Sequence, residues 1–132
     1  LFHELVECAI VLDIPIWLHS DDKLVTSFNL SDISSLLRKY SEARFILTSM
    51  YKDAIYVANL HHNVFLDTAV FELGQDLVKI LQPIGSLRIF MGSNTPHNTL
   101  ENEKGKIVLS KELSEFQKSL ILGKNLIKTL NI

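Results

Sequence analysis

The sequence predicts an α/β fold in which helices cover a parallel sheet. Four short apolar segments rich in β-formers alternate along the chain with segments whose apolar residues recur at helical spacing. The short segments are hydrophobic at both odd and even positions, which is typical of strands buried on both faces. Because such strands alternate with amphipathic helices, a parallel sheet is the expected arrangement.

The composition is that of an ordinary folded domain. The chain has 132 residues, of which 47% are hydrophobic and 21% are charged, so we expect one globular domain (1–132). The formal charge of −2 argues against nucleic acid as a partner, because nucleic-acid-binding domains are usually basic. Since no apolar run is long enough to span a bilayer, no membrane segment is expected. The single cysteine, Cys8, excludes an internal disulfide and favours a reducing, cytoplasmic location.

The first half of the chain contains two predicted strands. Helical spacing of apolar residues predicts a helix over residues 1–12, with Cys8 as a small core residue on its apolar face. Residues 14–19 form the first predicted strand, which ends in a polar loop. A second helix is expected over residues 33–40, and residues 44–48 form the second strand.

The second half repeats this alternation. A short helix is expected over residues 52–60, and the third strand covers residues 64–68. The next helix covers residues 73–81, and residues 87–92 form the fourth strand. Residues 93–105 are predicted to be a polar loop, and its unusual length makes it a candidate functional loop.

The C-terminal segment is predicted to be helical with one interruption. Ser114 and Gln117 have the spacing of a capping box, in which each side chain satisfies a backbone N–H of the first helical turn. Gly123 is expected to interrupt this helix, which then resumes towards Leu130.

Every predicted strand ends in polar residues. In order along the chain, these are His19-Ser20, Thr48-Ser49, Asp67-Thr68 and Ser93-Asn94. Polar strand ends can simply meet solvent, but here all the strands share the pattern. Ligands and catalytic groups of parallel α/β folds lie at the carboxyl edge of the sheet, so we expect a small polar site there.

Alternation along the first strand places Trp17 and His19 on one face, opposite Ile14, Ile16 and Leu18. If the aliphatic face meets the helices, Trp17 and His19 point to the inside of a curved sheet. The ordinary pKa of an imidazole suits it to bind a metal or to carry a proton, so His19 is a candidate for either role.

Residues 14–19, 63–68 and 84–96 carry motifs in a characteristic order, of which the Gly-Ser-Asn-Thr-Pro sequence after the last strand is the most specific. Residues 121–127 add a Gly-Lys-Asn sequence in the final helix. Together they resemble the C-terminal half of an amidohydrolase-related TIM barrel of the amidohydrolase 2 type. The resemblance implies a (β/α)8 barrel, to which this chain contributes strands five to eight.

Members of this family are metal-dependent hydrolases and decarboxylases, and the resemblance implies a divalent metal, most simply zinc, in an active protein. It places His19 at the metal-ligand position of the fifth strand. It also places Ser49, or Thr48 by a shift of one residue, and Asn94 at site positions where the family has His and Asp. A neutral amide cannot act as a carboxylate ligand or base, and a hydroxyl cannot replace an imidazole at neutral pH. The resemblance therefore implies a degenerate metal site with Ser49 and Asn94 at its catalytic positions.

Three further residues are candidates for binding a small-molecule substrate. Trp17 would line the inner face of the sheet. His97 either reaches over the site towards a carboxylate of the ligand or is an exposed loop histidine. Asp67 either faces the site or holds a neighbouring backbone N–H or Arg88.

Two adjacent histidines, His61 and His62, precede the third strand at the opposite edge of the sheet, and both are expected at the surface.

Two functional hypotheses follow for the chain. It is either part of an active metal-dependent enzyme or an inactive relative that binds a small molecule or serves as a structural subunit. Because a half barrel has unpaired edges, we expect either a homo-oligomer or completion by a missing N-terminal half. The chain begins at Leu1 rather than Met, which also suggests a piece of a longer protein.

Overall fold

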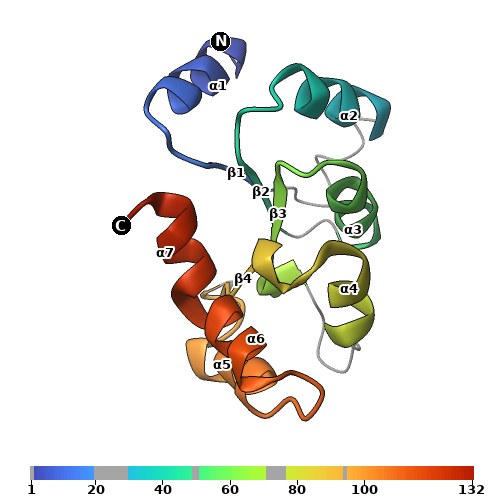
Figure 1. Cartoon of the computed structure of the whole chain (residues 1–132), viewed down its shortest axis with the longest axis vertical. Coiled ribbons are helices and arrows are strands. Elements are labelled where there is room, and N and C mark those ends of the chain that lie inside the picture. The colour runs from blue at the N-terminus through green and yellow to red at the C-terminus, as the bar shows by residue number, and fades with distance from the viewer. Residues whose placement is uncertain (1, 20–29, 49–50, 71–76, 94) are drawn as a thin grey trace.

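A computed structural model describes residues 2–19, 30–48, 51–70, 77–93 and 95–132 of the chain. The fold is α/β with four parallel strands, as the sequence predicts (Figure 1). The strands are β1 (Ile16–His19), β2 (Phe45–Thr48), β3 (Val64–Asp67) and β4 (Ile89–Phe90). They pair in the order β1-β2-β3-β4, each with its neighbour in sequence.

The helices follow the strands in alternation. They are α1 (Phe2–Val11), α2 (Leu30–Lys39), α3 (Tyr51–Leu60), α4 (Leu77–Ile84), α5 (Leu100–Val108), α6 (Glu115–Ser119) and α7 (Asn125–Leu130). Helices α2, α3 and α4 lie in a row along one side of the sheet, and α5, α6 and α7 lie around β4 (Figure 1). Among the described residues, no helix combines the length and the apolar character needed to cross a bilayer.

The hydrophobic core lies between the sheet and its helices. Phe45, Leu47 and Leu66 point to this side and are buried against helical side chains such as Leu37 and Val57. Because residues alternate along a strand, the next residues face the other way and form the inner face of the sheet.

The inner face carries aromatic side chains. The rings of Phe65 and Phe90 stack with centroids 5.3 Å apart, beside the buried Ile46. Trp17 pairs with Ile46 in the register of β1 and β2 and lies on this face, as the alternation along the first strand predicts. Trp17 is 48% exposed, so it is only partly covered.

Two buried amide side chains fix the connections that lead into the strands. The Nδ2 atom of Asn63 lies within 3.3 Å of the carbonyl oxygens of Leu37, Tyr40 and Ala43, to which it donates. Asn125, the last residue of the Gly-Lys-Asn sequence, donates to the carbonyls of Ser86 and Ile89 and so joins α7 to β4.

Arg88 has a similar role between the helices and the sheet. Its guanidinium donates to the carbonyl oxygens of Ala58, His61 and Val64, and it also reaches Ile84. Val64 begins β3 and Asp67 ends it, so Arg88 lies at the other end of this strand and is not the partner of Asp67.

The structure corrects the prediction for residues 93–105. This segment is not one long loop, because α5 begins at Leu100. The hydroxyl of Thr99 caps the helix by accepting from the backbone N–H of Asn102. Acidic residues in the first turn also stabilise the helix, because its N-terminus carries a partial positive charge. The fourth strand is also shorter than predicted, because residues 86–88 form a 3₁₀ turn that delays it until Ile89.

Two predictions about which residues are buried are wrong. Cys8 is exposed, and α1 buries Val6 and Ala9 instead. The helix carries apolar residues on more than one side, so its periodicity did not determine which side meets the core. His61 is buried rather than at the surface, and its Nε2 atom has no hydrogen-bond partner among the described residues.

The C-terminal helices agree with the prediction. Ser114 and Gln117 form the capping box at the start of α6. A π-helical turn over Leu120–Lys124 contains the non-helical Gly123 and separates α6 from α7. The predicted helix over residues 73–81 is seen only as α4, since residues 71–76 lie outside the described part.

Candidate functional site

Asp67 ends β3 at the carboxyl edge of the sheet and is only 5% exposed. Its Oδ1 atom accepts a hydrogen bond from the backbone N–H of Ala69 at 2.6 Å, and its Oδ2 atom accepts from the hydroxyl of Thr48 at 3.4 Å. Asp67 therefore holds a neighbouring backbone N–H, which is one of the alternatives that the sequence left open.

Thr48 connects Asp67 to the indole of Trp17. The Nε1 atom of Trp17 donates to Thr48 Oγ1 at 2.7 Å, so the hydroxyl accepts from β1 and donates to β3. Three side chains from three adjacent strands thus form one chain of hydrogen bonds at the carboxyl edge. We call Trp17, Thr48 and Asp67 the edge triad. It fixes the orientation of the indole while leaving its ring partly exposed.

The surroundings of Asp67 make its carboxyl group hold a proton more readily than usual. Burial raises its pKa above the ordinary value, and the charge of Glu103 acts in the same direction. The hydrogen bonds from Ala69 and Thr48 partly oppose this rise in the pKa, since they stabilise the charged form. A carboxyl group of this kind can retain or transfer a proton at a less acidic pH than an exposed aspartate.

Gly92 lies directly against Asp67. A Cβ atom at position 92 would be 2.4 Å from the carboxyl carbon of Asp67, so only glycine fits beside this group. The backbone N–H of Gly92 donates to the hydroxyl of Thr68 at 3.2 Å, which ties the segment after β4 to the end of β3.

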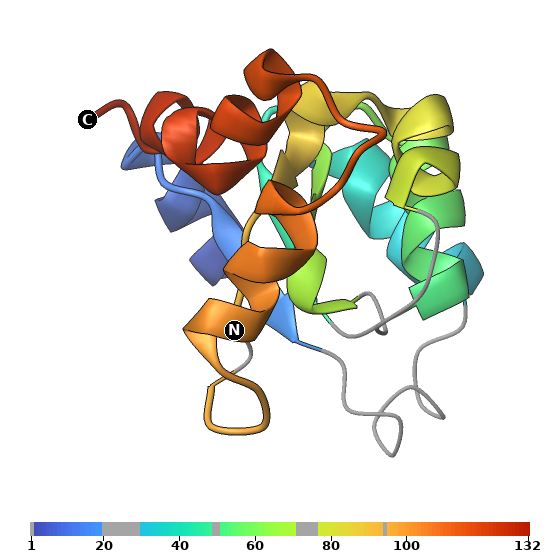
Figure 2. The ribbon, with the colours of Figure 1, turned by 90° about the horizontal axis from the view of Figure 1, so that it is seen from below.

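The segment between β4 and α5 turns back on itself beside the edge triad. The hydroxyl of Ser93 lies 2.9 Å from that of Thr95, and the Thr95 hydroxyl donates to the carbonyl of Asn98 at 3.4 Å. The peptide bond between Thr95 and Pro96 is cis, and His97 is exposed at the following position. This segment and the carboxyl ends of β1 and β3 lie on the lower side of the molecule in Figure 2.

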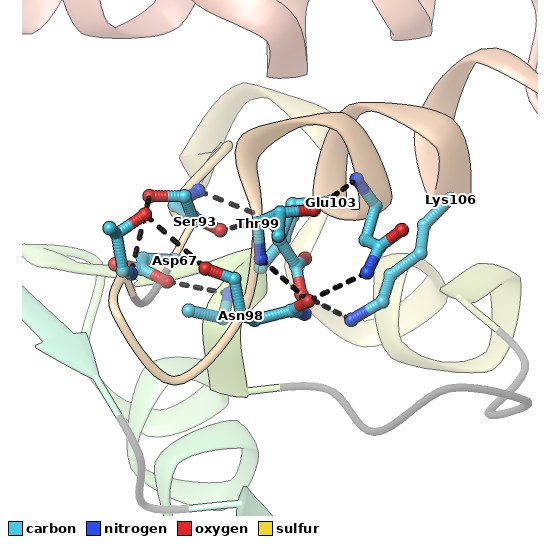
Figure 3. Close-up of polar contacts among 11 residues, drawn as sticks. Asp67, Ser93, Asn98, Thr99, Glu103 and Lys106 are labelled. Carbon is cyan, nitrogen blue, oxygen red and sulfur yellow. Dashed lines mark hydrogen bonds and ion pairs between the residues drawn. The ribbon is translucent and has the colours of Figure 1, made fainter.

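The structure also shows a buried carboxylate that sequence reasoning missed. Glu103 on α5 accepts hydrogen bonds at Oε1 from Asn98 and Lys106 (Figure 3). Its Oε2 atom is buried and has no hydrogen-bond partner among the described residues. The sequence analysis missed Glu103 because it predicted a loop over this segment. The available signal was an acidic residue shortly after Thr99, a residue type that often caps a helix.

Several predicted site residues lie beyond what the structure describes. Ser49 and Asn94 are outside the described residues, as is the side chain of His19, whose backbone pairs with Thr48 at the end of β1. Among the described residues, no three His, Cys, Asp or Glu side chains are grouped so that they could hold a metal ion. The described donors therefore do not form a complete metal centre by themselves.

The fold is half of a TIM barrel of the kind found in amidohydrolase 2 proteins and related decarboxylases. The chain is similar to an uncharacterised TIM-barrel protein from Bordetella bronchiseptica, with a TM-score of 0.79 and 16% identity over 98% of this chain and 50% of that one. It is also similar to an amidohydrolase 2 protein from Bifidobacterium longum subsp. infantis, with a TM-score of 0.68 and 15% identity over 96% of this chain and 53% of that one.

A third similar structure is a dihydroxybenzoic acid decarboxylase from Polaromonas sp. JS666, which holds manganese and the inhibitor 2-nitroresorcinol. Its TM-score is 0.68, with 16% identity over 95% of this chain and 52% of that one. This chain thus spans about half the length of each of these proteins. No protein-family model and no curated protein matches the sequence.

Proposed function

We propose that this chain is the C-terminal half of a metal-dependent barrel enzyme, a hydrolase or decarboxylase that acts on a small molecule through an altered site. The observation that carries the proposal is the edge triad, which joins a partly exposed indole to a buried carboxyl group at the carboxyl edge. One of the similar barrels, 16% identical in sequence, is a decarboxylase of dihydroxybenzoic acid. This similarity supports the proposal that the substrate is aromatic.

Each member of the triad has a distinct role in this proposal. The exposed part of the Trp17 ring provides a flat apolar surface on which an aromatic substrate can stack. Asp67 holds or transfers a proton, which its burial favours. Thr48 holds the indole and the carboxyl group in a fixed relative position, because its hydroxyl forms a hydrogen bond with each of them. His97 lies in the neighbouring loop, from which it would contact a substrate carboxylate.

His19 is the proposed metal ligand of this chain. It ends β1 at the same edge, and a divalent ion there would supply Lewis-acid chemistry to a substrate oxygen. A catalytic zinc site usually needs three protein ligands, so the other ligands would come from outside the described residues. Zinc is our first candidate for the metal; manganese is bound by the similar decarboxylase.

The proposed partner is a second unit with its own strands, either an N-terminal half of the same polypeptide or a second copy of this chain. β1 pairs only with β2 in the described sheet, and the inner face exposes Trp17 beside it. Such an edge and face are normally covered by a neighbouring strand.

The alternative function is a binding protein without turnover, and the residues at positions 49 and 94 favour it. Ser49 and Asn94 stand where the resemblance implies His and Asp. In that case the edge triad would bind a small aromatic molecule and leave it unchanged.

The deciding experiment is metal analysis by mass spectrometry of the complete protein, purified without a chelating column. We expect bound zinc or manganese in the unmodified protein and its loss in His19→Ala, with no change in the control His62→Ala, an exposed histidine before β3. Absence of metal would refute the enzyme proposal. The part of the intrinsic fluorescence that Trp17→Phe removes then tests the alternative, because Trp17 is the only tryptophan of residues 1–132 and 2,6-dihydroxybenzoate bound on its ring should change the emission.

A further inference from the structure

Glu103 is buried at the carboxyl edge, yet the proposed function gives it no task. Its side chain is 2% exposed, and it shares its Oε1 atom between Asn98 and the ammonium group of Lys106. Burial of a carboxylate is costly unless hydrogen bonds and an opposite charge compensate it. A glutamate kept in such a place is therefore expected to have a role that depends on these contacts.

Asn98 is the residue through which Glu103 acts on the loop. Its Nδ2 atom donates to Glu103, and its Oδ1 atom accepts from the backbone N–H of Thr99 at 2.8 Å and from Asn102 at 3.2 Å. Its backbone carbonyl accepts from the hydroxyl of Thr95. The Asn98 side chain and carbonyl thus join the two ends of the turn over residues 95–99 to the first turn of α5 (Figure 3).

We propose that Glu103 is a positioning residue: through Asn98 it fixes the loop of residues 95–99, and with it His97, beside the edge triad. The contribution of this loop to a ligand site rests on the proposed function, whereas the anchoring of the loop does not. The chemical requirement is an acceptor oxygen at the Oε1 position, because that atom makes both contacts of the carboxylate.

The loop begins where its position matters for the site. Gly92 lies against the Asp67 carboxyl group, and the loop of residues 95–99 begins three positions later in the chain. Asp67, Ser93 and Asn98 appear together with Glu103 in Figure 3. The charge of Glu103 also raises the pKa of Asp67, which agrees with their placement at the same edge.

A second glutamate provides a matched comparison. Glu115 on α6 also forms an ion pair with the lysine three residues later, Lys118. Its side chain is 90% exposed, so it has the helical pair without the burial. An exposed pair of this kind contributes little to stability. If the pair with lysine were the whole role of Glu103, the two glutamates would behave alike.

The test is hydrogen–deuterium exchange on the complete protein, comparing Glu103→Leu, Glu103→Gln and the control Glu115→Leu. In Glu103→Leu we expect the amides of Thr99 and Asn102 to exchange about tenfold faster, because the loop opens locally, while amides in β2 and β3 keep their rates. Glu103→Gln retains an acceptor oxygen and should stay close to the unmodified protein. The control should leave the loop unchanged.

Asn98→Ala provides a second route if Glu103→Leu fails to fold. It removes the amide that Glu103 holds without burying a new group, and it should reproduce the faster exchange at Asn102, whose backbone N–H donates to Thr99 and not to Asn98. Unchanged exchange in this variant, or an equal increase in β2 and β3 in Glu103→Leu, would overturn the proposal.

The same variants separate the anchoring role from the proposed function. A titration with 2,6-dihydroxybenzoate, followed by Trp17 fluorescence, should show weaker binding in Glu103→Leu and near-normal binding in Glu103→Gln. If the unmodified protein does not bind this probe or a metal, the proposed function fails. The exchange rates would still decide whether Glu103 positions the loop.

Discussion

The carboxyl group of Asp67 occupies the space that a side chain at position 92 would need. A Cβ atom on Gly92 would lie 2.4 Å from the carboxyl carbon and from both carboxyl oxygens of Asp67. The glycine is thus required by a contact between the segment after β4 and the end of β3, and not by its own backbone angles. Asp67 can end its strand buried only because the neighbouring segment has no side chain at this point.

Replacing this glycine is expected to destabilise the protein and displace Asp67. Gly92→Ala should lower the free energy of unfolding by about 1–3 kcal/mol, the usual cost of overpacking. Urea denaturation measures the change. The matched control is Gly105→Ala, where an added Cβ meets nothing within 4 Å and α5 should gain about 0.5–1 kcal/mol. An equal effect of the two changes would contradict this account.

The hydroxyl of Thr48 is expected to hold the edge triad together. Thr48→Val keeps the shape but removes the group that accepts from Trp17 and donates to Asp67. The buried partners lose a hydrogen bond, which should cost about 1–3 kcal/mol of unfolding free energy. Trp17 emission should shift as well. Ser119→Ala, at an exposed hydroxyl on α6, is the control and should change stability by less than about 0.5 kcal/mol.

The titration of Asp67 is expected to appear in the pH dependence of stability. Because burial raises its pKa in the folded protein, the folded state binds the proton more tightly than the unfolded state. This contribution to stability is complete below the ordinary aspartate pKa and is lost as the pH rises through the raised value.

Asp67→Asn removes the loss of stability at higher pH, because an amide does not ionise. The amide can still accept from the backbone N–H of Ala69 and contact Thr48. Relative to the unmodified protein, the variant should therefore become more stable as the pH increases from 3 to 7, about the range over which aspartates titrate. Urea denaturation at a series of pH values measures the difference. A constant difference between the two proteins would show that the pKa of Asp67 is not raised.

Asn125 is expected to be essential for the attachment of α7. Asn125→Ala leaves the carbonyls of Ser86 and Ile89 without the donor that joins them to the helix. The expected cost is about 2–3 kcal/mol, because a buried acceptor and a half-buried one lose their partner. Thermal denaturation is the measurement, and Asn59→Ala on the exposed side of α3 is the control. A cost no larger than that of the control would contradict the assigned role.

The chain of residues 1–132 is expected to associate when it is produced alone. Its first strand has one described neighbour, and exposed apolar residues lie on this strand and on the segment before it: Phe2, Leu5, Leu12 and Trp17. Exposed apolar groups next to an open strand edge favour association. Size-exclusion chromatography with light scattering should show dimers or larger species. A stable monomer that melts cooperatively would contradict the proposed need for a second half.

The order and type of the elements could be predicted because they depend on local patterns. The strand that contains Phe45 is buried at every position and apolar up to its last residue, Thr48, and the capping box at Ser114 begins a helix as such spacing requires. Burial was harder to predict. Cys8 and His61 were misplaced because α1 has several apolar sides and because a histidine can be buried without a charge.

The site was predictable only in outline. Polar residues after each strand indicated the edge at which Thr48 and Asp67 meet, since parallel strands bring their carboxyl ends together. The contact of Asp67 with Gly92 and the link from Glu103 to Asn98 depend on side-chain geometry between segments. No periodicity or spacing in the sequence encodes such contacts.

The pairing of β1 to β4 in the order of the sequence has a consequence for how the protein is made. As the chain leaves the ribosome, β2, β3 and β4 each meet a neighbour that has already emerged, so none of the described strand pairs needs a distant segment. The sheet can grow by one strand and one helix at a time during synthesis. The free edge of β1 is then the surface on which a segment synthesised earlier, or a separate copy, would complete the growing sheet.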